Sequence, residues 1–214
     1  MPSDPLILGF DTSAAHCAAA LVLGETCLAQ AQQDMARGQA DALIPMLEQI
    51  LHDGSVAWGD LTALAVGIGP GNFTGIRIAV AAARGLALAL KIPAIGVSVF
   101  EARAFGHTRP LTVVEDARRG EVYVQDFTPD PAPPCLLDPT DAQGFPPMPI
   151  TGSAAENWAQ QTGGTVLPAR CPLAEAIARA AAYRLDQPQP RPAPLYIRPA
   201  DAAPPSEQPP LLLP

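Results

Sequence analysis

The residues best suited to chemistry lie between Gly67 and Asn72, where the sequence reads GIGPGN and leads directly into a long apolar segment. Gly67, Gly69 and Gly71 allow tight backbone conformations and a close approach of the main chain to a bound group. A glycine turn that enters a helix also gathers free N–H groups and the positive end of the helix dipole at one place. Such an arrangement is typical of sites that bind phosphate or another anion.

The spacing within this glycine loop weakens the phosphate interpretation. The loop does not follow G-x-x-x-x-G-K-[ST], because no lysine follows its last glycine. It does not follow G-x-G-x-x-G either, because Asn72 occupies the third glycine position. A plain strand-to-helix turn fits the same residues, so both interpretations stay open at the level of the motif.

Other candidate chemistry is sparse. The four cysteines are Cys17, Cys27, Cys135 and Cys171. They form no C-x-x-C pair and the three histidines have no metal-ligand spacing, so we expect free thiols and no metal site. Ser13 and His16 are a local pair, but an odd step along a strand places two side chains on opposite faces. Proteolysis needs an activated nucleophile or a metal-bound water and is therefore not expected.

The elements that must position the glycine loop follow from the hydrophobic pattern. We expect strands at 6–11, 17–23, 26–32, 61–68, 94–97, 111–115 and 121–127. We expect helices at 43–51, 73–90 and after Ser98, with Pro45 in about the first turn of the first helix and Gly54 closing it. This order of elements predicts an α/β fold with a mixed sheet.

Two of these helices have wide apolar faces. The helix at 73–90 carries only Arg77 and Arg84, followed by Lys91, and their spacing of seven places all three on one stripe. Its remaining surface is apolar, which fits either a helix enclosed by its own chain or a helix packed on a partner subunit. The candidate partner-binding residues are Leu43, Ile44, Leu47, Ile50, Leu51, Arg77, Val80, Ala83, Arg84 and Ala87.

Charge and composition limit the class of protein. The formal net charge of −8 disfavours binding of a nucleic-acid backbone by this chain alone. The N-terminus lacks the basic and long apolar regions of a signal peptide, and the longest apolar segment, 78–92, is interrupted by Arg84 and Lys91. We therefore expect a cytoplasmic protein with no membrane span. Of the 26 prolines, 20 lie from Pro129 onward, which predicts a loop-rich second region and an extended tail.

Four blocks of sequence together resemble one family. They are ILGFDTSAAHCAAAL, VGIGPGNFTGIRIAVAAARGLAL with IPAIGVSVFEA, EDARRGEVYVQDF and PLYIRPADA. The first three cover most of 7–127 in order, and the combination G-P-G-x-F-T-G-x-R-I with D-A-R-x-G-E-V-Y is highly specific. The chain is similar to the TsaB (YeaZ) family, the dimerisation subunit of the bacterial tRNA threonylcarbamoyladenosine system.

The resemblance implies a fold and a domain division. The fold would be of the ASKHA type, related to acetate kinase, Hsp70 and actin, with two lobes of mixed sheets flanked by helices. The lobes would span 1–105 and 106–200, the second short and proline-rich, and a proline-rich tail would span 201–214.

The resemblance also implies a non-catalytic role. A TsaB-type subunit binds and activates a TsaD-type transferase through the helices near 43–51 and 74–90, and a TsaE-type ATPase joins the complex. The same surface can close a homodimer, and tRNA is met only through the complex. No cofactor would be required, although ATP or ADP could sit at the heteromeric interface.

The sequence departs from the family in three places, one of which is the short, proline-rich C-terminal lobe, where the family's contacts are in question. Gln39 replaces a histidine found in many members, and Asn72 replaces a serine. As a small ASKHA phosphotransferase, the chain would use Asp11, Thr12, Gly69, Gly71 and Asn72 on a nucleotide phosphate. The wider family also carries an older description as an M22-type glycoprotease, which lacks support in these residues.

Overall fold

The apolar runs of the N-terminal half form one five-stranded sheet. In this computed structural model, which describes residues 4–130 and 132–198, the strands are β1 (Leu6–Asp11), β2 (His16–Leu23), β3 (Thr26–Asp34), β4 (Ala63–Gly67) and β5 (Ala94–Val97). Their order is β3-β2-β1-β4-β5. The first three strands are antiparallel, whereas β4 and β5 run parallel to β1. The sheet is therefore mixed, as expected.

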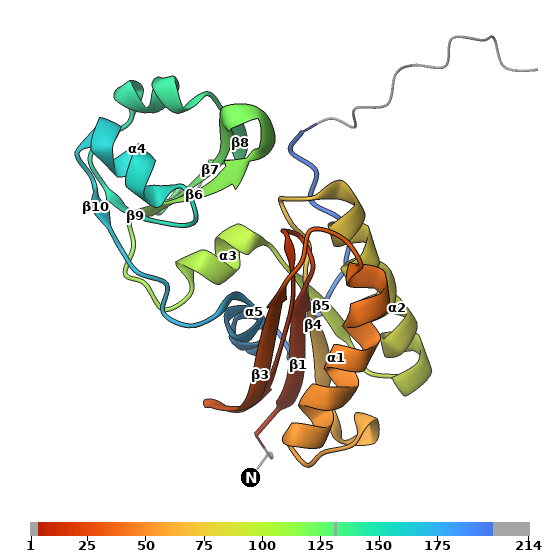
Figure 1. Ribbon diagram of the computed structural model, residues 1–214. Helices are drawn as coiled ribbons and strands as arrows, with labels where there is room; N and C mark the ends of the chain where they lie inside the picture. Colours follow the sequence, from red (N-terminus) through yellow and green to blue (C-terminus); the bar gives the residue numbers. More distant parts are fainter. Residues whose placement is uncertain (1–3, 131, 199–214) are drawn as a thin grey trace, which may run out of the picture.

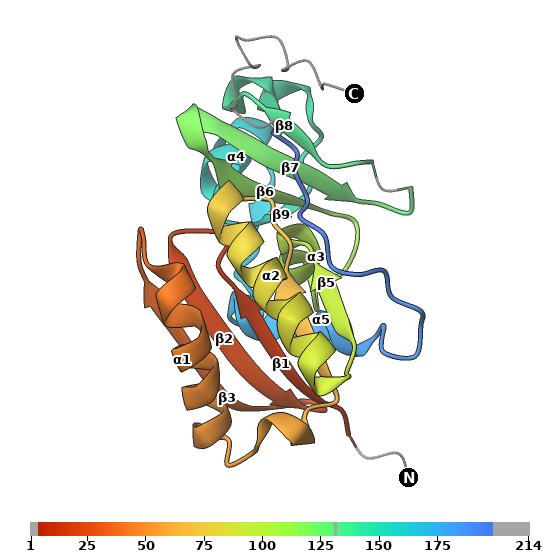
Figure 2. The same ribbon diagram turned by 90° about the vertical axis from the view of Figure 1, so that its right-hand side faces the viewer.

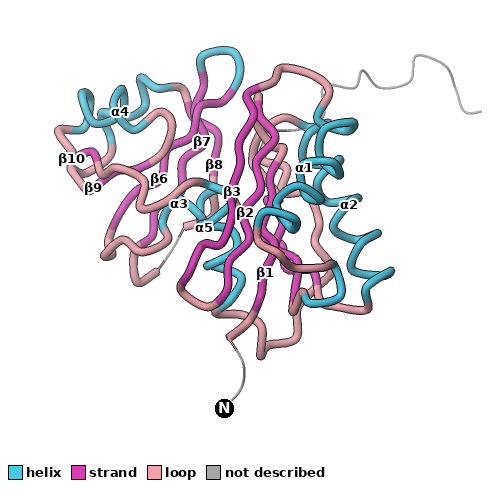
Figure 3. The backbone as a smooth tube through the Cα atoms, turned by 60° about the horizontal axis from the view of Figure 1, so that its bottom comes forward, coloured by secondary structure: helices cyan, strands magenta, loops and turns pink. Residues whose placement is uncertain are grey.

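A second five-stranded sheet repeats this plan (Figures 1 and 3). Its strands are β6 (Leu111–Ala117), β7 (Glu121–Phe127), β8 (Cys135–Leu137), β9 (Pro149–Thr151) and β10 (Thr165–Val166). Counted from β8, the order is β8-β7-β6-β9-β10, with two antiparallel pairs followed by two parallel pairs. Each lobe thus has a three-stranded meander continued by two parallel strands.

Helices cover both faces of the first sheet. The helices are α1 (Gln39–Asp53), α2 (Phe73–Leu90), α3 (Val99–Ala104), α4 (Ala155–Thr162) and α5 (Leu173–Ala182), with short 3-10 segments η1 (Trp58–Asp60), η2 (Arg118–Gly120) and η3 (Pro139–Gly144). Figure 2 shows α1 and α2 side by side on one face, with α3 and α5 behind the sheet. α4 packs on the second sheet.

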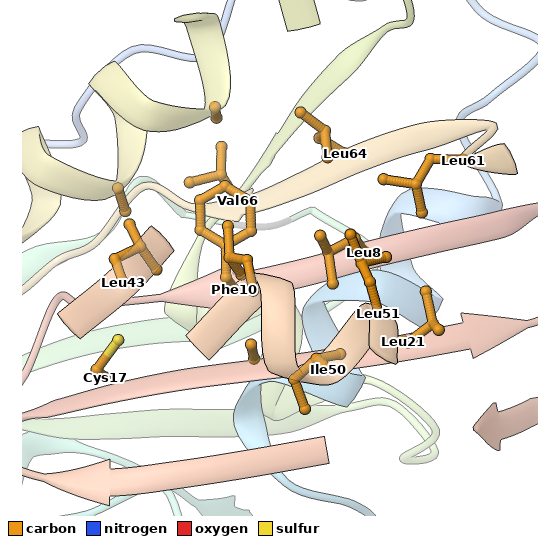
Figure 4. Packing of buried hydrophobic residues seen from close by; sticks show 14 of the residues in the cluster. Leu8, Phe10, Cys17, Leu21, Leu43, Ile50, Leu51, Leu61, Leu64 and Val66 are labelled. Carbon is orange, nitrogen blue, oxygen red and sulfur yellow. The ribbon is translucent and has the colours of Figure 1, made fainter. Parts of the chain in front are cut away.

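The main core lies between α1, α2 and the first sheet (Figure 4). Leu43, Ile50 and Leu51 of α1 meet Leu8 and Phe10 of β1, and all five side chains are buried. Burying each such side chain contributes roughly 1.5–3 kcal/mol. This packing fixes α1 and α2 against the sheet that leads into the glycine loop.

Three expectations need correction. Pro45 is not in the first turn, because α1 begins at Gln39 and Pro45 is its seventh residue. The expected boundary near residue 105 does separate the two sheets, but α5 returns to pack on β1, β2 and β4 of the first lobe.

The segment 78–92 was expected to be too interrupted to span a bilayer, yet α2 is long and apolar enough by length and composition. By itself one such helix is weak evidence for a membrane span, and the inner face of α2 packs on the sheet. The expected tail, 201–214, lies outside the described residues.

Candidate docking face and glycine loop

The glycine loop is closely packed against the turn after β1. A side chain on Gly71 would collide with the carbonyl of Ser13, and one on Gly75 would collide with the carbonyl of Thr12. The Thr12 hydroxyl donates to the Gly75 carbonyl at 2.7 Å. Glycine is therefore required at both positions by contacts within the chain.

The N-terminus of α2 is already occupied by its own cap. The Asn72 side-chain oxygen accepts hydrogen bonds from the backbone N–H groups of Thr74 at 3.0 Å and Gly75 at 3.3 Å. The N–H of Asn72 itself donates to the Ser13 carbonyl at 2.5 Å. These three N–H donors are therefore engaged within the chain, as in a capped strand-to-helix turn, and phosphate binding by this loop stays a prediction.

Asp11 lies at the end of β1 and is fully buried. Its Oδ1 accepts from the Ser13 N–H and hydroxyl, both at 2.9 Å, and lies 2.8 Å from His16 Nε2. Its Oδ2 is buried without a hydrogen-bond partner and faces Gly67. Nearby on β2, burial and then the Asp11 charge raise the pKa of the Cys17 thiol to about 11.

This cluster does not have the geometry of a hydrolytic triad. A triad needs the serine hydroxyl hydrogen-bonded to the histidine, which the acid then orients. Here the Ser13 hydroxyl donates to Asp11, and His16 bonds the same carboxylate oxygen. Asp116, a carboxylate near the end of β6, is exposed. Among the described residues, no three His, Cys, Asp or Glu side chains are grouped so as to hold a metal ion.

The structure reassigns most of the residues expected to bind a partner. Leu43, Leu47, Ile50, Leu51, Val80 and Ala83 are at most 3% exposed. They form the chain's own core, so none of them can contact a partner directly; this part of the expectation is corrected. Ala87 is partly buried against the same core. Ile44 is 38% exposed and keeps an outward position on α1.

The arginine stripe of α2 has an internal role that the spacing did not reveal. Arg77 Nε donates to the Tyr196 hydroxyl at 2.8 Å, and Arg84 Nε donates to the Pro192 carbonyl at 2.7 Å. Both arginines therefore hold the C-terminal segment of their own chain against the flank of α2. A pair of long-range partners more than a hundred residues apart leaves no local signal in the sequence.

The outer face of α2 is exposed and apolar; sequence reasoning predicted such a surface on this helix but did not identify the residues that form it. Only 28% of the helix residues are buried. Ala81, Gly85 and Leu88, spaced by four and three, share one exposed face, and Leu88 is 82% exposed. We call this face, together with the exposed Ile44 and Pro45 of α1, the docking face. Its signal in the sequence was the run of small and apolar residues at these α2 positions, beside Arg84.

Gln39 has a local structural role. It is buried at the start of α1, where its Nε2 donates to the Met35 carbonyl at 3.0 Å. It follows Gly38, whose positive φ of 93° begins the helix. The glutamine therefore anchors the connection from β3 to α1.

The comparisons with known proteins agree with this geometry. A family model described as "TsaD: tRNA N6-adenosine threonylcarbamoyltransferase" matches residues 27–169. The tRNA threonylcarbamoyladenosine biosynthesis protein TsaB of Escherichia coli (strain K12) is 38% identical over 130 residues, which are 58% of this chain and 55% of that protein. The chain thus matches only about half the length of this curated relative.

Solved structures give the same result. A structure of YeaZ from Pseudomonas aeruginosa matches with a TM-score of 0.66 and 27% identity, over 84% of this chain and 92% of that one. The Acidaminococcus fermentans (R)-2-hydroxyglutaryl-CoA dehydratase component A matches with a TM-score of 0.55 at 9% identity, covering 86% of this chain and 100% of that one. This second likeness concerns the fold alone.

Two lobes with the same strand order, joined to a glycine loop and an N-terminal acidic turn, define a protein of the actin- and Hsp70-like (ASKHA) class. Within that class, the four sequence blocks and the relatives agree on one group. The chain belongs to the TsaB (YeaZ) family.

Proposed function

We propose that this chain is a non-catalytic subunit in tRNA threonylcarbamoyladenosine biosynthesis, and that it binds and activates a TsaD-type transferase through the docking face. The observation that carries the proposal is the outer face of α2, where Leu88 is 82% exposed beside small residues. Relatives named for this biosynthesis supply the pathway, and the match to a TsaD-type family model fits a partner of related fold.

Leaving this apolar face in water is unfavourable, which favours a partner that covers it. Small residues at Ala81 and Gly85 let a partner helix approach closely, and a Cβ on Gly85 would meet only open space. A partner that covers Leu88 removes a large apolar side chain from solvent, and such side chains anchor the centres of interfaces. Another copy of the chain is the competing occupant, and a homodimer through this face would exclude the transferase.

The enzyme alternative is less well supported by the same geometry. A phosphotransferase would need free donors at the start of α2, but Asn72 caps them. Asp11 is enclosed by Ser13, His16 and Gly67, which leaves its carboxylate inside the protein. We therefore propose that any ATP or ADP, and any TsaE-type ATPase, engages the assembled complex rather than this chain alone.

The negative net charge also bears on which subunit contacts tRNA, and the role in tRNA modification bears on where the complex works. With a net charge of −8, the chain would repel the phosphate backbone, so the transferase would carry the tRNA contacts. The complex would work in the cytoplasm, where tRNA is modified.

Mass analysis of tRNA nucleosides tests the proposed role. Depletion of the chain should remove threonylcarbamoyladenosine, and wild type should restore it. Asp11→Asn, which keeps the shape of the buried side chain, should restore it as well. Unchanged nucleosides after depletion would contradict the role in this pathway. A folded Asp11→Asn variant that fails to restore the nucleoside would favour the enzyme alternative.

A further inference from the structure

The C-terminal segment Pro192–Arg198 crosses from one lobe to the other (Figure 2). We call these seven residues the clasp. At its start, the Pro192 carbonyl accepts from Arg84 of α2, and the Leu195 N–H donates to the Ile68 carbonyl of the glycine loop at 2.8 Å. The Leu195 carbonyl lies close enough to Gly69 to touch any side chain placed there. The first half of the clasp therefore lies on the first lobe.

The middle of the clasp holds the first turn of α2. The Tyr196 ring stacks on the Phe73 ring, with centroids 4.9 Å apart, and its hydroxyl accepts from Arg77. The Arg77 guanidinium also lies 3.7 Å from the centroid of the Phe73 ring. Stacked rings and a cation over an aromatic face each add a favourable contact beyond the burial of the side chains. The three side chains bind one another although all three are exposed.

The end of the clasp lies on the second lobe. Arg198 Nη2 donates to the carbonyl of Arg118, in the turn between β6 and β7, at 2.8 Å and pairs with Glu121, the first residue of β7. Leu195 and Ile197 pack on an apolar cluster that includes Val113 of β6. Between Pro192 and Arg198, the chain thus connects α2 to the β6–β7 hairpin.

We infer that the clasp couples α2 to the second lobe, so that docking on α2 and the ordering of the β6–β7 hairpin are energetically linked. In the part of the chain that the structure describes, only two other segments cross between the lobes, 105–110 and 167–172. The clasp contacts α2 at Phe73, Arg77 and Arg84. A coupling between two sites acts in both directions. Tyr196 and Arg198 are therefore positioning residues for the docking face.

The coupling itself is measured by amide hydrogen exchange in the free chain. The double variant Tyr196→Ala with Arg198→Ala removes the side-chain contacts of the clasp's middle with α2 and of its end with the hairpin. It should speed exchange in the glycine loop and in the hairpin at 117–122 together, while the strands of the two sheets keep their protection. Tyr196→Phe with Arg198→Lys keeps the ring and the charge and should restore at least the hairpin. Unchanged exchange in both regions, or no rescue by the conservative pair, would overturn the inference.

The link to docking rests on the proposed function and is tested with a TsaD-type transferase as the probe. Transferase binding to the wild type should slow exchange in the hairpin, which lies off the docking face, and the Ala pair should bind about tenfold more weakly without this remote protection. Tyr183→Ala, an exposed aromatic away from the clasp, is the matched control and should bind like wild type. Remote protection that persists in the Ala pair would overturn the coupling. A wild type that does not bind the transferase would contradict the proposed function, while the free-chain measurement still decides on the clasp.

Discussion

At the scale of single residues, the side chains around Asp11 show how a motif with catalytic residue types can serve packing. The sequence supplied an acid, a serine and a histidine within six positions. The structure turns the serine and the histidine toward the same carboxylate oxygen, and it encloses the other oxygen beside Gly67. Their identities were available from the sequence, but their directions were not, because direction depends on how β1 and β2 turn into the glycine loop.

Cys17 provides a residue-scale prediction for alkaline pH. Its pKa is raised from 9.0 to about 11 in the folded chain, so the folded state keeps a proton that the unfolded state loses above about pH 9. The free energy of unfolding should therefore fall as pH rises from about 9 to 11, by at most roughly 2–3 kcal/mol from this thiol. Urea unfolding at several pH values measures the slope. Cys17→Ala should lower stability at pH 7 through the lost side chain but flatten this alkaline slope, and an unchanged slope would contradict the assignment.

At the scale of the elements, α2 accounts for most of what could and could not be predicted. Its bounds, 73–90, were readable because the glycine loop starts it and no breaker interrupts its apolar pattern. The sequence could not predict which apolar residues of α2 point toward the sheet, because a helix without a polar face does not show which side faces solvent. Leu88 and Val80 look alike in the sequence, yet one is 82% exposed and the other 3%.

The same helix contains a matched pair of glycines. A side chain on Gly75 would collide with the Thr12 carbonyl, whereas one on Gly85 would meet nothing. Gly75→Ala should therefore cost roughly 1–3 kcal/mol of unfolding free energy. Gly85→Ala should instead raise stability by up to about 1 kcal/mol, since alanine is the better helix former. Thermal and urea unfolding compare the two; equal effects of the two substitutions would show that the glycine loop is not packed as described.

At the scale of the whole molecule, the two lobes share a strand order, although no sequence repeat predicted it. Each sheet has a three-stranded antiparallel meander that is continued by two parallel strands. The strand orders are β3-β2-β1-β4-β5 in the first lobe and β8-β7-β6-β9-β10 in the second. Topology of this kind can persist with no recognisable repeat, since each lobe needs only buried strands in the same sequence of directions. The position of α5 was missed for a related reason, because its apolar face fits either sheet until the chain is followed back to β1.

The central claim is that the outer face of α2 docks a TsaD-type transferase, and one binding measurement tests it most directly. Leu88→Arg places a charge on the exposed docking face without touching the core, and Val166→Arg, at a residue 41% exposed on β10, is the matched control. Both variants should unfold at nearly the wild-type temperature, because neither residue belongs to the buried core.

Titration calorimetry with the purified transferase should show at least about hundredfold weaker binding for Leu88→Arg, or about 2.7 kcal/mol, and wild-type binding for Val166→Arg. Wild-type affinity in a folded Leu88→Arg variant would contradict the docking face and leave α2 as a helix of this chain alone.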